Sequence, residues 1–202
     1  MIRRTILLAY VGGFMNIRIG AAALSFAVAA ASASPAYADD FTGFRSELHA
    51  GYDAVSSQYT VSGVMAGTGI GYDVAVGKGV TLGIEANLDY SSAKDEGVAF
   101  GVSYSQVARR DIELSARIGA KLGQRTLGYF KAGYSNAGYE GAAAGVGVWA
   151  YESGTSDGLR LGLGLEQRLG ENWYLKGEYR YTRYGADEVN RNQAVFGMGY
   201  RF

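Results

Sequence analysis

Large apolar residues occupy every second position through most of the chain after residue 43, and the residues between them are small or charged. An alternation with a period of two is typical of β-strands, because successive side chains point to opposite faces of a sheet. Residues 80–90 alternate without an exception. The same pattern predicts eight strands in all, at residues 44–53, 69–76, 80–90, 111–122, 129–135, 159–166, 173–182 and 193–202.

The connections between these strands alternate between short and long. Short turns are predicted at residues 77–79, 123–125 and 170–172, and long loops at residues 54–66, 91–110, 136–157 and 183–192. Barrels of the bacterial outer membrane have short periplasmic turns, longer external loops and an even number of strands. Tilted strands of about 9 to 11 residues are long enough to cross the bilayer. The pattern therefore predicts an all-β fold, an eight-stranded antiparallel up-and-down transmembrane β-barrel.

In such a barrel the apolar face of each strand meets lipid and the polar face lines the lumen. A charge that faced lipid would cost roughly 2 to 4 kcal/mol near the midplane. Eight strands enclose a lumen that side chains can fill, so we expect its charges to pair across it, with glycines such as Gly71 and Gly162 leaving room. The predicted lumen charge network comprises Arg45, Glu47, His49, Glu85, Glu113, Arg117, Lys131, Arg160, Glu166, Lys176, Glu178 and Arg180.

Aromatic residues gather near both ends of the predicted apolar faces. Outer-membrane barrels carry aromatic girdles at the two membrane interfaces. The pattern predicts one belt of Tyr52, Tyr90, Tyr134 and Tyr181 at the loop end, and another that includes Phe44 and Trp173 at the turn end.

The N-terminal segment has the features of an export signal. Arg18 precedes the uncharged run 19–33, and the small-residue pattern of residues 36–38 precedes Asp39. This run is shorter than the roughly 20 residues that a membrane-spanning helix needs. We expect residues 1–38 to be a cleaved signal peptide, with Met15 as an alternative true start, and residues 39–202 to form a single barrel domain.

Composition excludes several kinds of site. The chain contains no cysteine, which rules out disulfides and cysteine-based metal or redox centres. Its 19 basic and 19 acidic residues balance, and no basic cluster follows the signal segment, so no nucleic-acid partner is expected. Residues 94–96 are charged but lie in a predicted loop without a second carboxylate cluster, which argues against a cation site. We predict no cofactor and no metal.

The end of the chain resembles a known family. KGEYRYTRYG at residues 176–185, followed by NQAVFGMGYRF at residues 192–202, is similar to the final hairpin of the small opacity-type outer-membrane β-barrel proteins, which share the architecture of the OmpA transmembrane domain. The resemblance implies a place in the bacterial outer membrane, contact with its lipid and lipopolysaccharide, and biogenesis with periplasmic chaperones and the outer-membrane assembly machinery. It also implies an assembly signal at Phe202, Tyr200 and Met198. Because the sequence ends with the barrel, we expect no cell-wall tether.

Several functions remain open from the sequence. The leading prediction is a non-enzymatic structural or surface-exposed barrel whose long loops meet the environment and an unknown surface ligand. The most apolar of these loops, residues 141–147 leading to Trp149 and Tyr151, could contact a partner or lipopolysaccharide. One alternative is a narrow channel for ions or small solutes, although open aqueous pores usually need sixteen or more strands.

Two further alternatives place different demands on the residues. A lipid-modifying barrel enzyme would use His49, the only histidine, together with a serine and an acid. His49 lies beside Glu47 on the polar face, so we predict a structural hydrogen-bonding role for it instead. A soluble lipocalin-like binder would place apolar residues inside and charges outside.

Overall fold

The computed structural model describes residues 41–56, 60–99, 102–145, 148–185 and 189–202. The predicted signal peptide of residues 1–38 and the alternative start at Met15 lie outside the described residues. The described chain forms nine β-strands: β1 (Gly43–Ser56), β2 (Thr60–Gly77), β3 (Val80–Ser91), β4 (Lys94–Ala99), β5 (Val102–Lys121), β6 (Thr126–Gly145), β7 (Val148–Arg168), β8 (Trp173–Tyr184) and β9 (Val189–Arg201).

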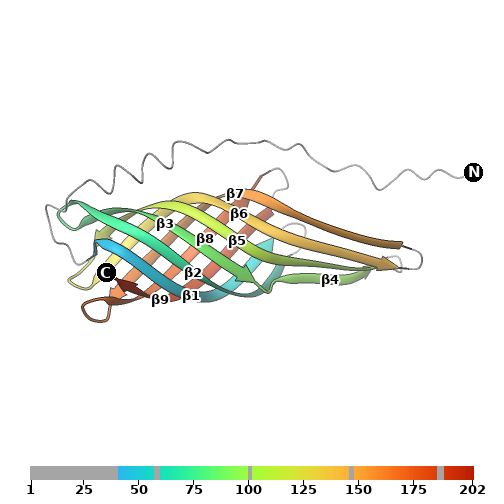
Figure 1. Ribbon diagram of the computed structural model, residues 1–202, viewed down its shortest axis with the longest axis horizontal. Helices are drawn as coiled ribbons and strands as arrows, with labels where there is room; N and C mark the ends of the chain where they lie inside the picture. The colour runs from blue at the N-terminus through green and yellow to red at the C-terminus, as the bar shows by residue number, and fades with distance from the viewer. Residues whose placement is uncertain (1–40, 57–59, 100–101, 146–147, 186–188) are drawn as a thin grey trace, which may run out of the picture. The chain divides into compact units, whose positions relative to one another are not determined.

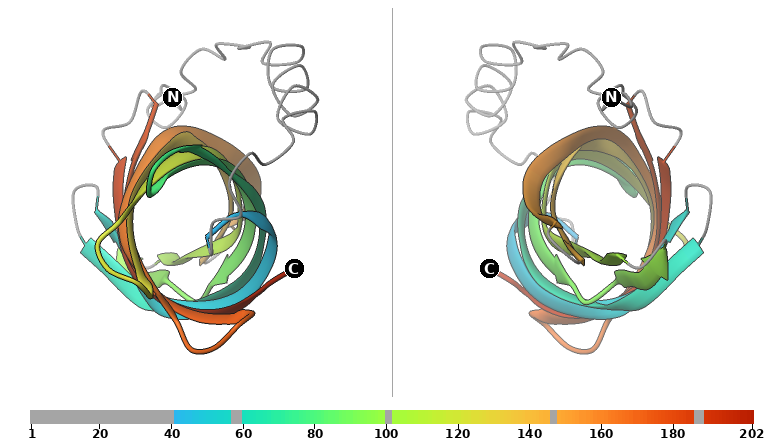
Figure 2. Two further views of the ribbon diagram at one scale, coloured as in Figure 1. Left: turned by 90° about the vertical axis from the view of Figure 1, so that its left-hand side faces the viewer. Right: turned by 90° about the vertical axis from the view of Figure 1, so that its right-hand side faces the viewer.

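Eight of these strands close into a ring (Figures 1 and 2). Strand β1 pairs with both β2 and β9, and β3 pairs with β5, so that the sheet has no open edge around the barrel wall. The remaining strand, β4, pairs with β5 only and stands outside the ring. All of these pairings are antiparallel. The predicted eight-stranded antiparallel β-barrel is confirmed. Among the described residues, no helix is long and apolar enough to cross a membrane.

Side chains follow the predicted alternation, with apolar residues outside and charged residues inside. Leu48 and Leu163 on the outer wall are 71% and 65% exposed, whereas Glu85 and Arg117 in the lumen are each 1% exposed. Each strand of the ring turns one face toward the lumen and the other toward the outside, because successive side chains of an extended strand point to opposite faces. This distribution is the reverse of the one that a lipocalin-like binder requires.

The predicted long loops are wrong in extent, because strands continue through most of them. Strand β1 runs to Ser56 and β2 begins at Thr60, and β6 runs to Gly145 with β7 beginning at Val148. Loop 91–110 is likewise replaced by β4 and the start of β5, and loop 183–192 by the ends of β8 and β9. Backbone pairing needs only N–H and C=O groups, so it continues through Gly, Ala and Ser after the apolar alternation has ended.

The longest strands form an arm that extends beyond the ring (Figure 1). Strands β4, β5, β6 and β7 pair side by side in this arm, and β8 joins β7 only from Gly158 onward. A register shift between Ala108 and Asp111 marks the level at which β5 leaves the barrel wall. Residues 94–96, predicted as loop, therefore lie in a strand. The opposite end of the barrel has short turns at residues 78–79, 122–125 and 169–172.

Candidate functional site

The interior of the barrel is filled by ionisable side chains. Nine carboxylates, eight Lys or Arg side chains and His49 are buried there, and each residue is at most 7% exposed. All twelve residues of the predicted charge network are among them. Six more belong to the same interior: Asp53, Asp73, Asp89, Asp111, Arg191 and Arg201.

Asp73 on β2 is the centre of the layer nearest the turns. Arg45 Nε donates to Asp73 Oδ2 at 3.0 Å, Arg117 Nε donates to Asp73 Oδ1 at 2.8 Å, and Arg201 Nη1 donates to Asp73 Oδ2 at 2.8 Å. Glu166 accepts from Arg117 Nη2 at 3.1 Å and from Arg201 Nη2 at 3.2 Å. Three guanidinium groups thus converge on one carboxylate, which ties β1, β2, β5 and β9 together.

Phe41 lies at the turn end of this layer. Its ring is buried, with Lys121 Nζ 5.6 Å and Arg168 Cζ 5.9 Å from the ring centroid. Arg201 Nη1 also donates to the Phe41 carbonyl oxygen at 2.9 Å. Cations over an aromatic face are attracted by its quadrupole. Phe41 therefore extends the charged layer to the turn end of the lumen.

Lys131 on β6 is the centre of the middle layer. Its ammonium nitrogen lies 2.8 Å from Glu85 Oε1, 2.8 Å from Glu113 Oε1 and 2.8 Å from Glu178 Oε1. All four side chains are fully shielded from solvent. Lys176 pairs with Glu47 beside this group. One ammonium with three N–H donors can satisfy three carboxylates, and removal of such a cation leaves buried charges uncompensated.

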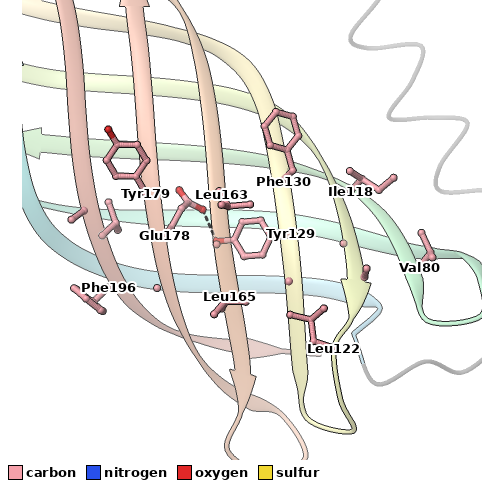
Figure 3. Close-up of a pocket in the computed structure, with 17 residues that line it drawn as sticks. Val80, Ile118, Leu122, Tyr129, Phe130, Leu163, Leu165, Glu178, Tyr179 and Phe196 are labelled. Atoms are coloured by element: carbon pink, nitrogen blue, oxygen red, sulfur yellow. Dashed lines mark hydrogen bonds between the residues drawn. The ribbon is translucent and has the colours of Figure 1, made fainter.

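Two tyrosines complete the inner layers. Tyr129 Oη donates to Glu178 Oε2 at 2.5 Å, and Figure 3 shows the ring directed toward that carboxylate. Tyr174 Oη donates to Glu47 Oε2 at 3.0 Å. Both rings are 2% exposed and fill lumen space with an apolar body while their hydroxyls satisfy acceptors.

The layer nearest the external arm contains the remaining acids. Arg191 Nη2 donates to Asp53 Oδ2 at 2.6 Å, and its Nη1 donates to Asp111 Oδ2 at 2.8 Å. Arg160 pairs with Asp111 and also donates to Glu113 Oε2 at 3.1 Å, which connects this layer to the middle one. The pairing therefore runs without a break from the turn end to the arm end of the lumen.

His49 lies between two carboxylates. Its Nε2 is 2.5 Å from Asp89 Oδ1 and its Nδ1 is 3.3 Å from Glu47 Oε1, and the side chain is fully shielded. A serine nucleophile would need one of these nitrogens. Both ring nitrogens face acids, and the ring lies on the opposite side of the wall from the lipid-facing surface. Within the described residues, no group of three or more His, Asp or Glu side chains is arranged to hold a metal ion.

Glycines on the inner face make room for the long side chains. A Cβ added at Gly162 would lie 2.8 Å from both Cγ and Cε of Lys131, and one at Gly71 would lie 2.6 Å from Arg45 Nη2. Such contacts are shorter than real Cβ atoms allow. A larger residue at either position would therefore displace the Lys131 or Arg45 side chain from its ion pairs.

The residues predicted for the aromatic belts and the assembly signal all lie on the outer face. Phe202 and Tyr200 form part of one cluster at the turn end, with ring centroids 4.9 Å apart, and Phe44 and Trp173 pack against them at 5.5 Å and 5.2 Å. Met198 is exposed on the same strand. At the arm end the corresponding tyrosines, exposed or half-buried, are Tyr52, Tyr90, Tyr134 and Tyr181.

The six interior residues absent from the predicted network carried a usable signal. Asp53, Asp73, Asp89 and Asp111 sit on the polar side of the alternation, at or near strand ends, and Arg201 does so beside the last residue. Arg191 fell in a predicted loop that is in fact strand β9. Five of the six thus lie on the polar face of strands that the sequence already predicts, and only Arg191 required the last strand to begin two residues earlier.

Comparison with known proteins agrees with this architecture. A family model described as the outer membrane protein beta-barrel domain matches residues 20–202. The 31 kDa outer-membrane immunogenic protein of Brucella melitensis is 26% identical over 170 residues, covering 73% of this chain and 70% of that protein.

Solved structures show the same fold at low sequence identity. Neisserial surface protein A aligns with a TM-score of 0.57 and 19% identity, over 80% of this chain and 98% of its own. Ail, the attachment invasion locus protein of Yersinia pestis, aligns with a TM-score of 0.55 and 16% identity, over 79% of this chain and 99% of its own. The resemblance to opacity-type barrels is confirmed, and the chain belongs to the outer membrane protein beta-barrel domain family of the bacterial outer membrane.

Proposed function

We propose that this chain is a non-enzymatic outer-membrane barrel with a closed lumen, in which the ring of strands is a rigid scaffold and the external arm meets the environment. The observation that carries the proposal is the continuous pairing of buried charges through the lumen. The paired side chains are fully shielded from solvent, and each is held by partners from other strands. A conducting pore would need hydrated, exposed charges.

The external arm supports the surface role. Trp149 and Tyr151 near the tip of the β6–β7 hairpin are 83% and 59% exposed, and large aromatic side chains of this kind are enriched at protein interfaces. The Brucella relative is named as immunogenic, and Ail is named for attachment and invasion. We extend the proposal to this chain: its arm is exposed at the cell surface and contacts lipopolysaccharide or a surface ligand. Biogenesis through periplasmic chaperones and the assembly machinery completes it.

A solute-permeability assay tests the closed lumen. Liposomes that contain the refolded residues 39–202 are diluted into an isotonic solution of a small sugar, and their swelling is followed by light scattering. The proposal predicts the swelling rate of protein-free liposomes. Faster swelling would support the narrow channel instead.

The enzymatic alternative has a separate test. Lipid A is extracted from cells that express the wild-type chain, a His49→Gln variant or no protein, and is compared by mass spectrometry. The proposal predicts three identical profiles. A modified lipid A that disappears with His49→Gln would establish the lipid-modifying function.

A further inference from the structure

The buried charges of the lumen balance only if His49 is counted among the cations. Nine carboxylates and eight Lys or Arg side chains lie in the interior, and each of these residues is at most 7% exposed. Lys121 and Arg168 at the turn end are half-buried and remain in contact with solvent. A buried charge without a partner is strongly destabilising. Among the buried residues that the structure describes, His49 is the only other side chain that can carry a positive charge.

Both ring nitrogens of His49 face carboxylate oxygens. Nε2 lies 2.5 Å from Asp89 Oδ1, and Nδ1 lies 3.3 Å from Glu47 Oε1. A carboxylate oxygen can only accept a hydrogen bond, whereas a neutral imidazole has one nitrogen with a lone pair and no hydrogen. In the neutral form this lone pair would be directed at one of the two acids. Both contacts are favourable only when both ring nitrogens carry a hydrogen.

The two acids also accept hydrogen bonds on their second oxygen. Asp89 Oδ2 accepts from Arg180 Nη1 at 2.8 Å. Glu47 Oε2 accepts from Tyr174 Oη at 3.0 Å and from Arg45 Nη1 at 3.3 Å. Such donors favour the carboxylate over the protonated acid. The hydrogen between the ring and each acid therefore belongs to the ring.

Packing holds the ring in this position. A Cβ added at Gly67 on β2 would lie 2.8 Å from His49 Nε2, and one added at Gly197 on β9 would lie 3.0 Å from His49 Cβ. Strands β2 and β9 thus contact the side chain closely and do so through glycines, which bring no charge. The enclosed ring cannot turn away from its two acids.

The other charged groups that face the ring are Lys176 and Arg180 on β8. Lys176 pairs with Glu47 and also lies 3.7 Å from Glu178 Oε2. Arg180 pairs with Asp89 and with Glu178. These two cations are therefore shared by three acids, and a positively charged ring supplies a third cation beside them.

We propose that His49 is a fixed cation of the folded barrel, with a hydrogen on each ring nitrogen, and that the lumen is electrically neutral only in this state. In the unfolded chain water surrounds the ring, and a histidine in water loses its charge at about pH 6.5. Folding at a higher pH therefore takes up one proton. An alkaline medium that removes this proton leaves nine carboxylates against eight cations, so the barrel becomes less stable as the pH rises.

NMR spectroscopy of the ring nitrogens tests the charge directly, because His49 is the only histidine of the chain. Residues 39–202 are produced with nitrogen-15-labelled histidine and without a histidine tag, refolded in detergent micelles, and recorded at about pH 8, where an exposed imidazole is neutral. Both ring nitrogens are expected to carry a hydrogen and to show the chemical shifts of an imidazolium. A ring nitrogen without a hydrogen would overturn the proposal.

A second measurement follows the unfolding equilibrium of the wild type and of His49→Gln in urea between about pH 7 and 9, below the range in which Lys and Tyr titrate. The unfolding constant of the wild type should rise about tenfold per pH unit for as long as the folded ring keeps its proton. His49→Gln has no ring to titrate, so it should be less stable at neutral pH and lack this rise. Equal pH dependence in the two proteins would overturn the proposal.

Discussion

Lys131 on β6 donates from Nζ to Glu85 Oε1 on β3 at 2.8 Å, past the intervening strand β5, and both side chains are fully shielded. The same ammonium lies 2.8 Å from Glu113 and from Glu178. One cation therefore compensates three carboxylates at the centre of the barrel. The free energy of the folded state should depend on it more than on any surface pair.

Lys131→Met removes this cation while it keeps a long unbranched side chain. We predict that the free energy of unfolding falls by about 3 to 5 kcal/mol, because three buried carboxylates lose a partner. Urea unfolding of the protein in phospholipid vesicles measures the change. Lys94→Met is the matched control: it removes an ion pair with Glu96 in which both side chains are more than half exposed, and it should cost less than about 1 kcal/mol. Equal losses in the two variants would show that the interior pairs do not stabilise the barrel.

The alternation of residues predicts which side chains of the barrel face inward, but not which of them pair. Glu85 and Lys131 can be placed in the lumen from the sequence because each lies between apolar neighbours. Their contact depends on the tilt and stagger of strands around a closed ring. The pair Asp73 and Arg201, 128 residues apart, is set by the same geometry. The length of the arm cannot be predicted from the sequence either, because its strands lack the alternation of apolar and polar residues.

Gly162→Ala tests whether the lumen is filled to its limit. The new Cβ would lie 2.8 Å from Lys131 Cγ, and Lys131 cannot move without losing its three acids. We expect a loss of about 1 to 3 kcal/mol in the free energy of unfolding, as for an overpacked core. The Cβ that Gly170→Ala adds would have no atom within 4 Å, so this variant should change the free energy of unfolding by less than about 0.5 kcal/mol. A harmless Gly162→Ala would imply unfilled space beside Lys131.

Phe202→Ala tests the predicted assembly signal. In vitro, the free energy of unfolding of the variant should fall by about 0.5 to 1.5 kcal/mol for each lost aromatic contact, one with Phe44 and one with Tyr200. In cells, folded protein in the outer-membrane fraction should fall sharply, as measured by heat-dependent gel mobility. Phe44→Ala removes one of the same ring contacts but leaves the terminus intact, so its cellular assembly should persist. If both variants lose the same amount of folded protein from the outer-membrane fraction, the effect of Phe202→Ala is due to lower stability and not to a lost assembly signal.

The ring of strands should fold with the same stability when the arm is shortened. Glu140 and Ser153 face each other in register, so residues 141–152 can be replaced by an Asn-Gly turn. We predict an unchanged urea midpoint, because the lumen pairs and the strands around the ring remain. The shortened chain should at the same time bind less lipopolysaccharide from solution. A large drop in the midpoint would mean that the arm is part of the folding unit and not an addition to it.

The closed lumen is tested most directly by single-channel recording. Residues 39–202 are refolded, inserted into a planar bilayer in concentrated potassium chloride, and compared with an Arg117→Ala variant that removes a guanidinium bound to Asp73 and Glu166. The charge network predicts a silent wild-type barrel, with the current of the bare bilayer. Steady unitary steps in the wild type, of a size that Arg117→Ala alters, would show that ions pass through the network and would contradict a closed lumen.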